Sequence, residues 1–202
     1  LGEGGMISTN SNKIFKKIWS LKDNGKNYKK FKNRNKNKNN KFLFLHDFIG
    51  TNARLTEIQS EAGIYHLEKL YFYIKRRNEN AQIYLNAFKN INFFDPLFVS
   101  KNNVNAYYRF TFLINIKLIK KKFTYQKILN DLSSLVNNVT VGSCPSILNE
   151  LTFNKLSKSN NLPVALSVGK RVISLAVDQT ISKKSIKQNS LIIKEYFEKI
   201  SK

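Results

Sequence analysis

The first third of the chain has apolar residues at helical spacing. Met6–Thr9 is predicted to be a short extended segment. Apolar positions separated by four and three residues from Ile14 to Leu21 then predict a helix with one apolar face. Asn10 is a suitable N-cap for this helix, and Asn24–Gly25 is a typical C-terminal stop.

A second and longer helix is predicted from Thr56. Thr56 and Gln59 form the pattern of a capping box, in which the side chain of each residue bonds to the backbone N–H of the other. The helix is predicted to continue to Phe88. Its apolar stripe, interpreted as packing surface, consists of Ile64, Leu67, Tyr71 and Ile74.

After Asp95–Pro96 the apolar period changes from that of a helix to that of a strand. Between Tyr108 and Ile116 apolar residues occupy every second position, which predicts a strand with one buried face. The other predicted elements are a helix over 128–135, a strand over 139–141, a short helical stretch from Pro145, a helix over 162–169, a strand over 172–177 and a helix over 186–200. Helices alternating with strands indicate an α/β or α+β layered fold.

Composition fits one domain or two small ones with a substantial core. The chain has 202 residues, of which 42% are hydrophobic, with 15 Phe and 9 Tyr. Cys144 is the single cysteine and there are two histidines, so we expect neither an intrachain disulfide nor a metal site. No apolar run is long enough to cross a bilayer. We therefore expect a soluble cytoplasmic protein.

The formal net charge is +22, from 35 Lys and Arg against 13 Asp and Glu. Such an excess commonly indicates nucleic acid or an anionic membrane as a partner. Here the lysines accompany many asparagines and are spread along the chain, a pattern that compositional drift at exposed positions also produces. We do not expect nucleic acid or a membrane to be the main partner.

The most basic segment is "GKNYKKFKNRNKNKNN", residues 25–40. It carries too few apolar side chains to compensate for the entropy of ordering, so we expect a disordered surface loop. The alternative is that Tyr28 and Phe31, set among lysines, stack on nucleic-acid bases.

Motifs with their own catalytic chemistry are absent from the sequence. There is no pattern of a Ser-His-Asp triad, a metal-ligand cluster or a P-loop, and Gly2-Glu3-Gly4-Gly5 lacks the spacing of a dinucleotide-binding loop.

Three segments nevertheless match one family in order and spacing: "GEGGMISTN", "GTNARLTEIQSEAGIYHLEKL" and "NLPVALSVGKRVISLAV". With them the chain resembles the pyridoxal-phosphate (PLP) sugar aminotransferases of the DegT/DnrJ/StrS group. The pieces "NAYYRF" and "VGSC" resemble the branch that includes perosamine-synthase-like enzymes. The resemblance covers nearly all of this chain and roughly the C-terminal half of the family's length.

The resemblance implies an α/β fold of PLP aminotransferase fold type I. Residues 1–55 would be the tail of the large cofactor-binding domain, and residues 56–202 the connecting helix and the small C-terminal domain. In the family, the lysine that holds the cofactor precedes the Gly-Glu-Gly-Gly turn, so its counterpart is expected upstream of residue 1. We therefore expect this chain alone to be inactive.

The resemblance also implies site residues and partners. Asn52 would bind the phosphate of the cofactor in the other subunit of a homodimer, and Gly2 and Glu3 would border the cofactor pocket. His46 and Ser143 would lie near the substrate. The family reaction passes an amino group from glutamate, through PLP, to a nucleotide-linked keto sugar for polysaccharide biosynthesis. No metal is implied.

Plainer interpretations remain open at several of these residues. Asn52 could be only a helix-entry residue and His46 only a packed side chain, while Arg54 and Glu57 are best explained as a structural ion pair. The sequence departs from the family pattern at Asn24, Ala53, Asp178 and Gln179. These departures leave a decayed, non-catalytic relative as an alternative beside the nucleic-acid binder.

Overall fold

A computed structural model describes residues 3–34, 44–97, 99–100, 102–142, 147–153 and 162–202. The chain divides into two compact units, Leu1–Lys69 and Leu70–Lys202. We call them the N-terminal unit and the C-terminal unit. The boundary after residue 55 that the family resemblance implies between its large and small domains stays a prediction.

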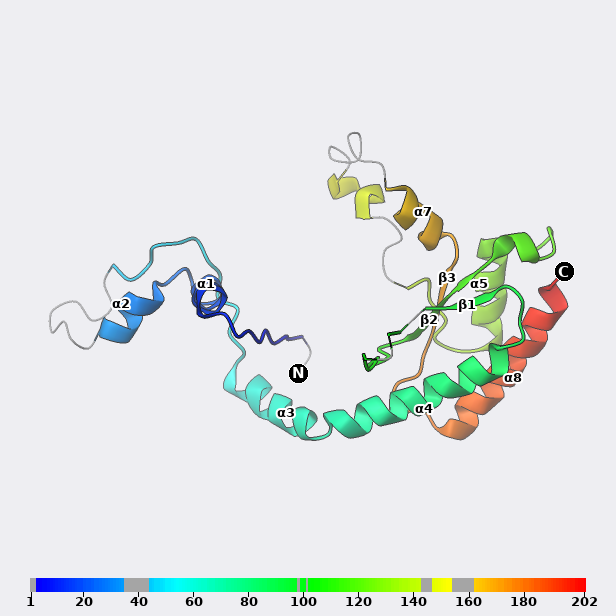
Figure 1. The fold of residues 1–202 in the computed structure, drawn as a ribbon, viewed down its shortest axis with the longest axis horizontal. Helices are drawn as coiled ribbons and strands as arrows, with labels where there is room; N and C mark the ends of the chain where they lie inside the picture. The colour runs from blue at the N-terminus through cyan, green and yellow to red at the C-terminus, as the bar shows by residue number, and fades with distance from the viewer. Residues whose placement is uncertain (1–2, 35–43, 98, 101, 143–146, 154–161) are drawn as a thin grey trace. The chain divides into compact units, whose positions relative to one another are not determined.

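The long helix predicted over 56–88 is two helices, so that prediction was wrong in its continuity. They are α3 (Glu57–Glu68) and α4 (Leu70–Phe88) (Figure 1). Between them the backbone N–H of Lys69 bonds to the carbonyl of Leu67 rather than one turn back, which ends the first helix. No glycine or proline marks this break in the sequence.

The start of α3 confirms the predicted capping box. The Thr56 hydroxyl accepts from the backbone N–H of Gln59 at 3.3 Å, and the Gln59 side chain accepts from the backbone N–H of Thr56 at 3.1 Å. The apolar stripe predicted as packing surface is not covered in the N-terminal unit. Ile64 and Leu67 are both 55% exposed, and no residue of α3 is buried.

The N-terminal unit also contains α1 (Asn12–Lys22) and α2 (Tyr28–Asn33). The N-cap of α1 is Ser11 rather than Asn10. The predicted strand over 6–9 does not form.

Helix α2 lies inside the segment predicted to be disordered, so that prediction was wrong for residues 25–34; residues 35–40 lie outside the described residues. The reason is aromatic packing. The Trp19 ring of α1 lies 5.2 Å from the ring of Tyr28 and 5.1 Å from that of Phe31. This contact supplies the apolar burial that the sequence of the segment alone does not show.

The C-terminal unit is built on an antiparallel sheet of order β1-β2-β3, formed by β1 (Phe94–Pro96), β2 (Phe110–Ile114) and β3 (Val172–Leu175). Helices α4 and α8 (Lys183–Ile200) pack side by side, and α5 (Tyr125–Leu135) packs with them (Figure 1). The shorter elements are η2 (Ile116–Leu118), η3 (Ile147–Asn149), η4 (Leu151–Phe153) and α7 (Pro163–Gly169).

Strand β2 confirms the predicted alternation. Phe110, Phe112 and Ile114 are buried, whereas Thr111 and Leu113 on the opposite face are only partly buried. The buried face meets aromatic rings of both long helices. Phe88 of α4 and Phe197 of α8 lie 5.3 Å apart, and each lies 6.1 Å from Phe112.

Two strand predictions differ from the structure. The segment 139–141 forms only an isolated bridge between Thr140 and Ser174, because Asn138 and Gly142 on either side adopt positive φ and turn the chain. Strand β1 was missed, since Asp95–Pro96 resembles a turn. A proline is tolerated there because β1 is an edge strand.

Among the described residues no helix is long and apolar enough to cross a membrane. Within the same residues no group of three or more His, Cys, Asp or Glu side chains is placed to hold a metal ion.

Replacing Phe197 with alanine tests the core. The ring is fully buried, so Phe197→Ala is expected to lower the free energy of unfolding by about 3–5 kcal/mol. Leu191→Ala on the same helix is the control, because Leu191 is 59% exposed, and it should change stability by less than about 1 kcal/mol. Urea unfolding followed by circular dichroism measures both. Equal losses for the two variants would contradict the assigned core.

Candidate functional site

The segment that carries Asn52 is tied to the end of α1 by backbone hydrogen bonds. The N–H of Thr51 donates to the carbonyl of Leu21 at 2.8 Å, and the N–H of Asn24 donates to the carbonyl of Thr51 at 3.1 Å. Asp23 and Asn52 form an isolated antiparallel bridge. Backbone contacts alone therefore hold Asn52 against the end of α1.

Two glycines permit this close approach. Gly25 adopts a φ of +78°, and a Cβ added there would lie 1.7 Å from the carbonyl oxygen of Phe48. A Cβ added to Gly50 would lie 2.3 Å from the backbone nitrogen of Gly25. Because any larger residue would collide with backbone at both positions, the two glycines set the position of Asn52.

Asp23 is the buried acid of this region. Its side chain is 5% exposed and accepts a hydrogen bond from Lys26 Nζ at 3.0 Å, and Arg54 lies 3.6 Å away. Burial alone would raise the pKa of Asp23. The hydrogen bond from Lys26 and the charges of Lys26, Arg54 and Lys22 together lower the pKa by more than burial raises it. The pKa of Asp23 therefore lies below its ordinary value. Asp23 is therefore ionised at neutral pH and holds two cations beside Asn52.

Arg54 connects Asp23 to Asn52. Its Nε donates to Oδ1 of Asn52 at 3.5 Å while its other end faces Asp23. Arg54 forms an ion pair, as predicted, but its partner is Asp23 and not Glu57. The predicted partner was therefore wrong. Because the amide oxygen of Asn52 faces Arg54, its NH₂ group faces away.

The other predicted site residues lie as follows. His46 is exposed and forms an isolated bridge with Lys26, so the segment 46–52 brings His46 and Asn52 to the same end of α1. Glu3 is exposed. Gly2 and Ser143 lie outside the described residues. The roles given to Asn52, Gly2, Glu3, His46 and Ser143 stay predictions.

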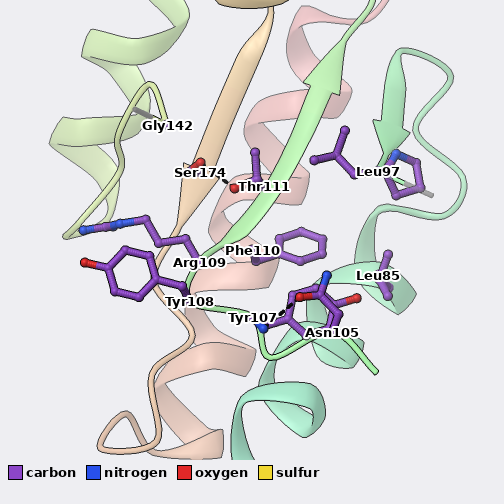
Figure 2. A pocket seen from close by; sticks show the side chains of 11 residues that line it. Leu85, Leu97, Asn105, Tyr107, Tyr108, Arg109, Phe110, Thr111, Gly142 and Ser174 are labelled. Carbon is purple, nitrogen blue, oxygen red and sulfur yellow. Dashed lines mark hydrogen bonds between the residues drawn. The ribbon is translucent and has the colours of Figure 1, made fainter. Parts of the chain in front are cut away.

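A pocket of about 430 Å³ lies in the C-terminal unit (Figure 2). Its lining combines the N-terminal part of β2 and the residues before it with side chains of α4 and β3. The lining residues named in Figure 2 include Leu85, Asn105, Tyr107, Tyr108, Arg109, Thr111 and Ser174. All of them belong to the C-terminal unit.

Two hydroxyl groups meet in this pocket. Thr111 of β2 and Ser174 of β3 are register partners on the face opposite the core, and their oxygens lie 2.7 Å apart (Figure 2). One hydroxyl of the pair donates to the other, so one O–H remains to donate elsewhere. The pair can therefore offer a hydrogen bond to a polar ligand group.

The pocket also carries a cation and two tyrosines. Arg109 donates to the carbonyl of Asn138 at 3.4 Å, and its guanidinium lies 5.9 Å from the ring centre of Tyr108, which is 79% exposed. Tyr107 adopts a φ of +42°, which is uncommon for an aromatic residue, and Asn105 Oδ1 accepts from its backbone N–H at 2.9 Å. Strained backbone of this kind concentrates at ligand-binding sites.

Sequence reasoning did not single out Asp23, Arg109 or the hydroxyl pair. In the sequence Asp23 is only an acid between two lysines in "LKDNGK", and Arg109 is only one of the alternating positions of a predicted strand. Thr111 and Ser174 are far apart in sequence, so their pairing depends on the β2–β3 register.

Over residues 1–191 the sequence matches the DegT/DnrJ/EryC1/StrS aminotransferase family. The chain belongs to this family. The match confirms the resemblance predicted from the sequence, and the solved relatives confirm the expected fold type I of PLP aminotransferases.

Relatives in the family include nucleotide-sugar enzymes. The chain is 24% identical over 199 residues to GDP-perosamine synthase of Vibrio cholerae, covering 97% of this chain and 49% of that protein. It is 29% identical over 127 residues to UDP-4-amino-4,6-dideoxy-N-acetyl-beta-L-altrosamine transaminase of Helicobacter pylori, covering 63% and 30%.

A solved relative is an aminotransferase from Psychrobacter cryohalolentis, with a TM-score of 0.81, 26% identity, and coverage of 96% of this chain and 51% of that one. The chain spans about half or less of the length of these relatives.

Replacing Asp23 with asparagine tests the ion-pair cluster through pH. Because the folded pKa of Asp23 is lowered, its charge stabilises the fold above the unfolded pKa of about 3.8, and this contribution disappears as the pH falls through the folded pKa. Asp23→Asn should therefore be less stable than the wild type at pH 7, with the difference shrinking at acidic pH below about 3.8. Thermal unfolding across pH measures this, and a difference that is constant with pH would contradict the assignment.

Proposed function

We propose that this chain is part of a PLP-dependent aminotransferase that transfers an amino group from glutamate to a nucleotide-linked keto sugar in the cytoplasm. Family membership carries the proposal. The described residues would bind the cofactor phosphate and the sugar nucleotide, and the whole enzyme would be a homodimer that serves polysaccharide biosynthesis.

The geometry around Asn52 fits a phosphate group. The Asn52 side chain is exposed, and within the described residues its NH₂ group has no hydrogen-bond partner. Arg54 and Lys26 surround Asp23 beside it, so the region is positive in spite of the buried carboxylate. An amide donor next to cations is suited to a phosphate oxygen, and the resemblance assigns that role to Asn52.

The pocket of the C-terminal unit fits a polar ligand with a flat ring. Arg109 can pair with a phosphate, Tyr108 offers an exposed ring, and the Thr111–Ser174 pair offers a hydroxyl donor. We infer that this pocket binds part of the sugar nucleotide.

PLP, when bound, supplies the electron sink for transamination. The residues of this chain have other tasks. Asn52 would hold the phosphate group, and the glycine pair at Gly25 and Gly50 would keep Asn52 in place. Such positioning lowers the entropic cost of bringing the reacting groups together.

The structure gives less support to the nucleic-acid alternative than the sequence did. The rings of Tyr28 and Phe31, predicted to be available for stacking on bases, instead contact Trp19, and each has a cation over its face.

Replacing Asn52 with alanine in the complete protein that contains this chain tests the phosphate role. Loss of a hydrogen bond to a charged group should weaken PLP retention by about tenfold or more. The absorbance of bound PLP after gel filtration measures retention, and its change on adding glutamate tests the reaction. Asn12→Ala, at an exposed asparagine of α1, is the control.

The outcomes separate the alternatives. Wild-type protein that folds but neither binds PLP nor responds to glutamate would contradict the aminotransferase proposal and favour the decayed relative. An active enzyme whose PLP retention is unchanged by Asn52→Ala would contradict only the role of Asn52.

Replacing Arg109 with glutamine tests the pocket. If Arg109 binds a phosphate of the sugar nucleotide, Arg109→Gln should raise the KM for that substrate by about tenfold while changing kcat much less. Steady-state kinetics with sugar nucleotides measures the effect. Arg171→Gln, at an arginine equally part-buried in the same unit, is the control. An unchanged KM would show that the pocket does not hold the phosphate.

A further inference from the structure

A basic groove of about 470 Å³ lies in the N-terminal unit, beside α1 and the start of α2. Lysines 13, 16 and 17 of α1 line one side, and Lys29 of α2 lines the other. Within the part of the chain that the structure describes, none of these four lysines forms an ion pair. Their charges are therefore available to an anion from outside the groove.

A buried hydroxyl in the groove lacks a partner. Ser20 lines the groove and is 4% exposed, and its Oγ has no hydrogen-bond partner among the described residues. Buried polar groups in folded proteins are almost always hydrogen-bonded. A hydroxyl that lacks this partner can donate to a ligand placed in the groove.

Two aromatic rings complete the lining. Phe48 is 61% exposed. Tyr28 is fixed by edge-on contacts with Phe15 at 5.4 Å and Trp19 at 5.2 Å between ring centres. The exposed ring of Phe48 therefore offers an apolar surface on which a flat ligand ring can stack.

No carboxylate occurs among the described residues that line the groove. Asp47 is not one of these lining residues, but it is hydrogen-bonded to Asn27, which is. It accepts from Asn27 at 2.7 Å and from Lys30, outside the groove, at 2.6 Å. These bonds lower the pKa of Asp47, the hydrogen bond from Lys30 having the largest effect. The formal charges of the described lining are thus all positive.

We propose that this groove binds a free nucleotide. The lysines would hold its phosphates, Ser20 would donate to a phosphate oxygen, and the base would stack on the exposed ring of Phe48. A volume of about 470 Å³ lies within the range of small-molecule sites in proteins. The proposed aminotransferase function uses none of these residues, so the two proposals can fail separately.

Isothermal titration calorimetry with ADP tests the proposal on the complete protein. ADP should bind at least about tenfold more tightly than inorganic phosphate, because the base adds a stacking contribution. Lys13→Gln/Lys16→Gln should weaken ADP binding by about tenfold or more. Lys184→Gln/Lys187→Gln is the matched control, since it removes the same charge at the same spacing from exposed positions of α8. It should leave the affinity unchanged.

Ser20→Ala separates a built site from a general attraction of anions. It changes no charge, and it should weaken ADP binding by about tenfold or more, the value of one hydrogen bond to a charged group. Equal affinity in the wild type and Lys13→Gln/Lys16→Gln, equal loss in the control, or ADP binding no tighter than phosphate would each overturn the proposal. Tighter binding of a short oligouridylate than of ADP would also overturn it, in favour of RNA.

Discussion

The C-terminal unit depends on the two faces of one strand. On one face of β2, Phe110 packs against Tyr84 of α4, and Phe112 packs against Phe88 and Phe197, which fixes α4 and α8 against the sheet. The opposite face carries Thr111, which meets Ser174 in the pocket. Because side chains of a strand alternate with a period of two, burial of Phe110 and Phe112 on the first face places Thr111 on the other.

In the N-terminal unit the corresponding constraint is steric. The backbones at Gly25 and Gly50 come so close that neither position has room for a Cβ. This contact brings the end of α1 to the residues around Asn52, and Asp23 then holds Lys26 and Arg54 there. The two candidate sites thus differ in origin, one set by apolar burial and the other by close backbone approach.

Charge and exposed apolar surface occur together in the N-terminal unit. Ile49 and Ile58 are 95% and 84% exposed, and lysines of α1 and α2 line the groove of the same unit. Large exposed apolar side chains in a folded protein commonly mark surfaces that contact another chain or domain. This agrees with the homodimer that we propose and with a chain that spans about half the length of its relatives.

The sequence by itself determined the family, because three segments match it in order and spacing. It also determined the capping box at Thr56 and the alternating strand at 110–114, because each of these depends on residues close together in the chain. It also indicated α7 and α8 through local periodicity and Pro163.

Only the tertiary structure decided the rest. Helix α2 is ordered by the ring of Trp19, Arg54 pairs with Asp23, and Thr111 meets Ser174. These contacts join residues that are distant in sequence, and their distances are set by packing and register, which no local pattern of side chains specifies.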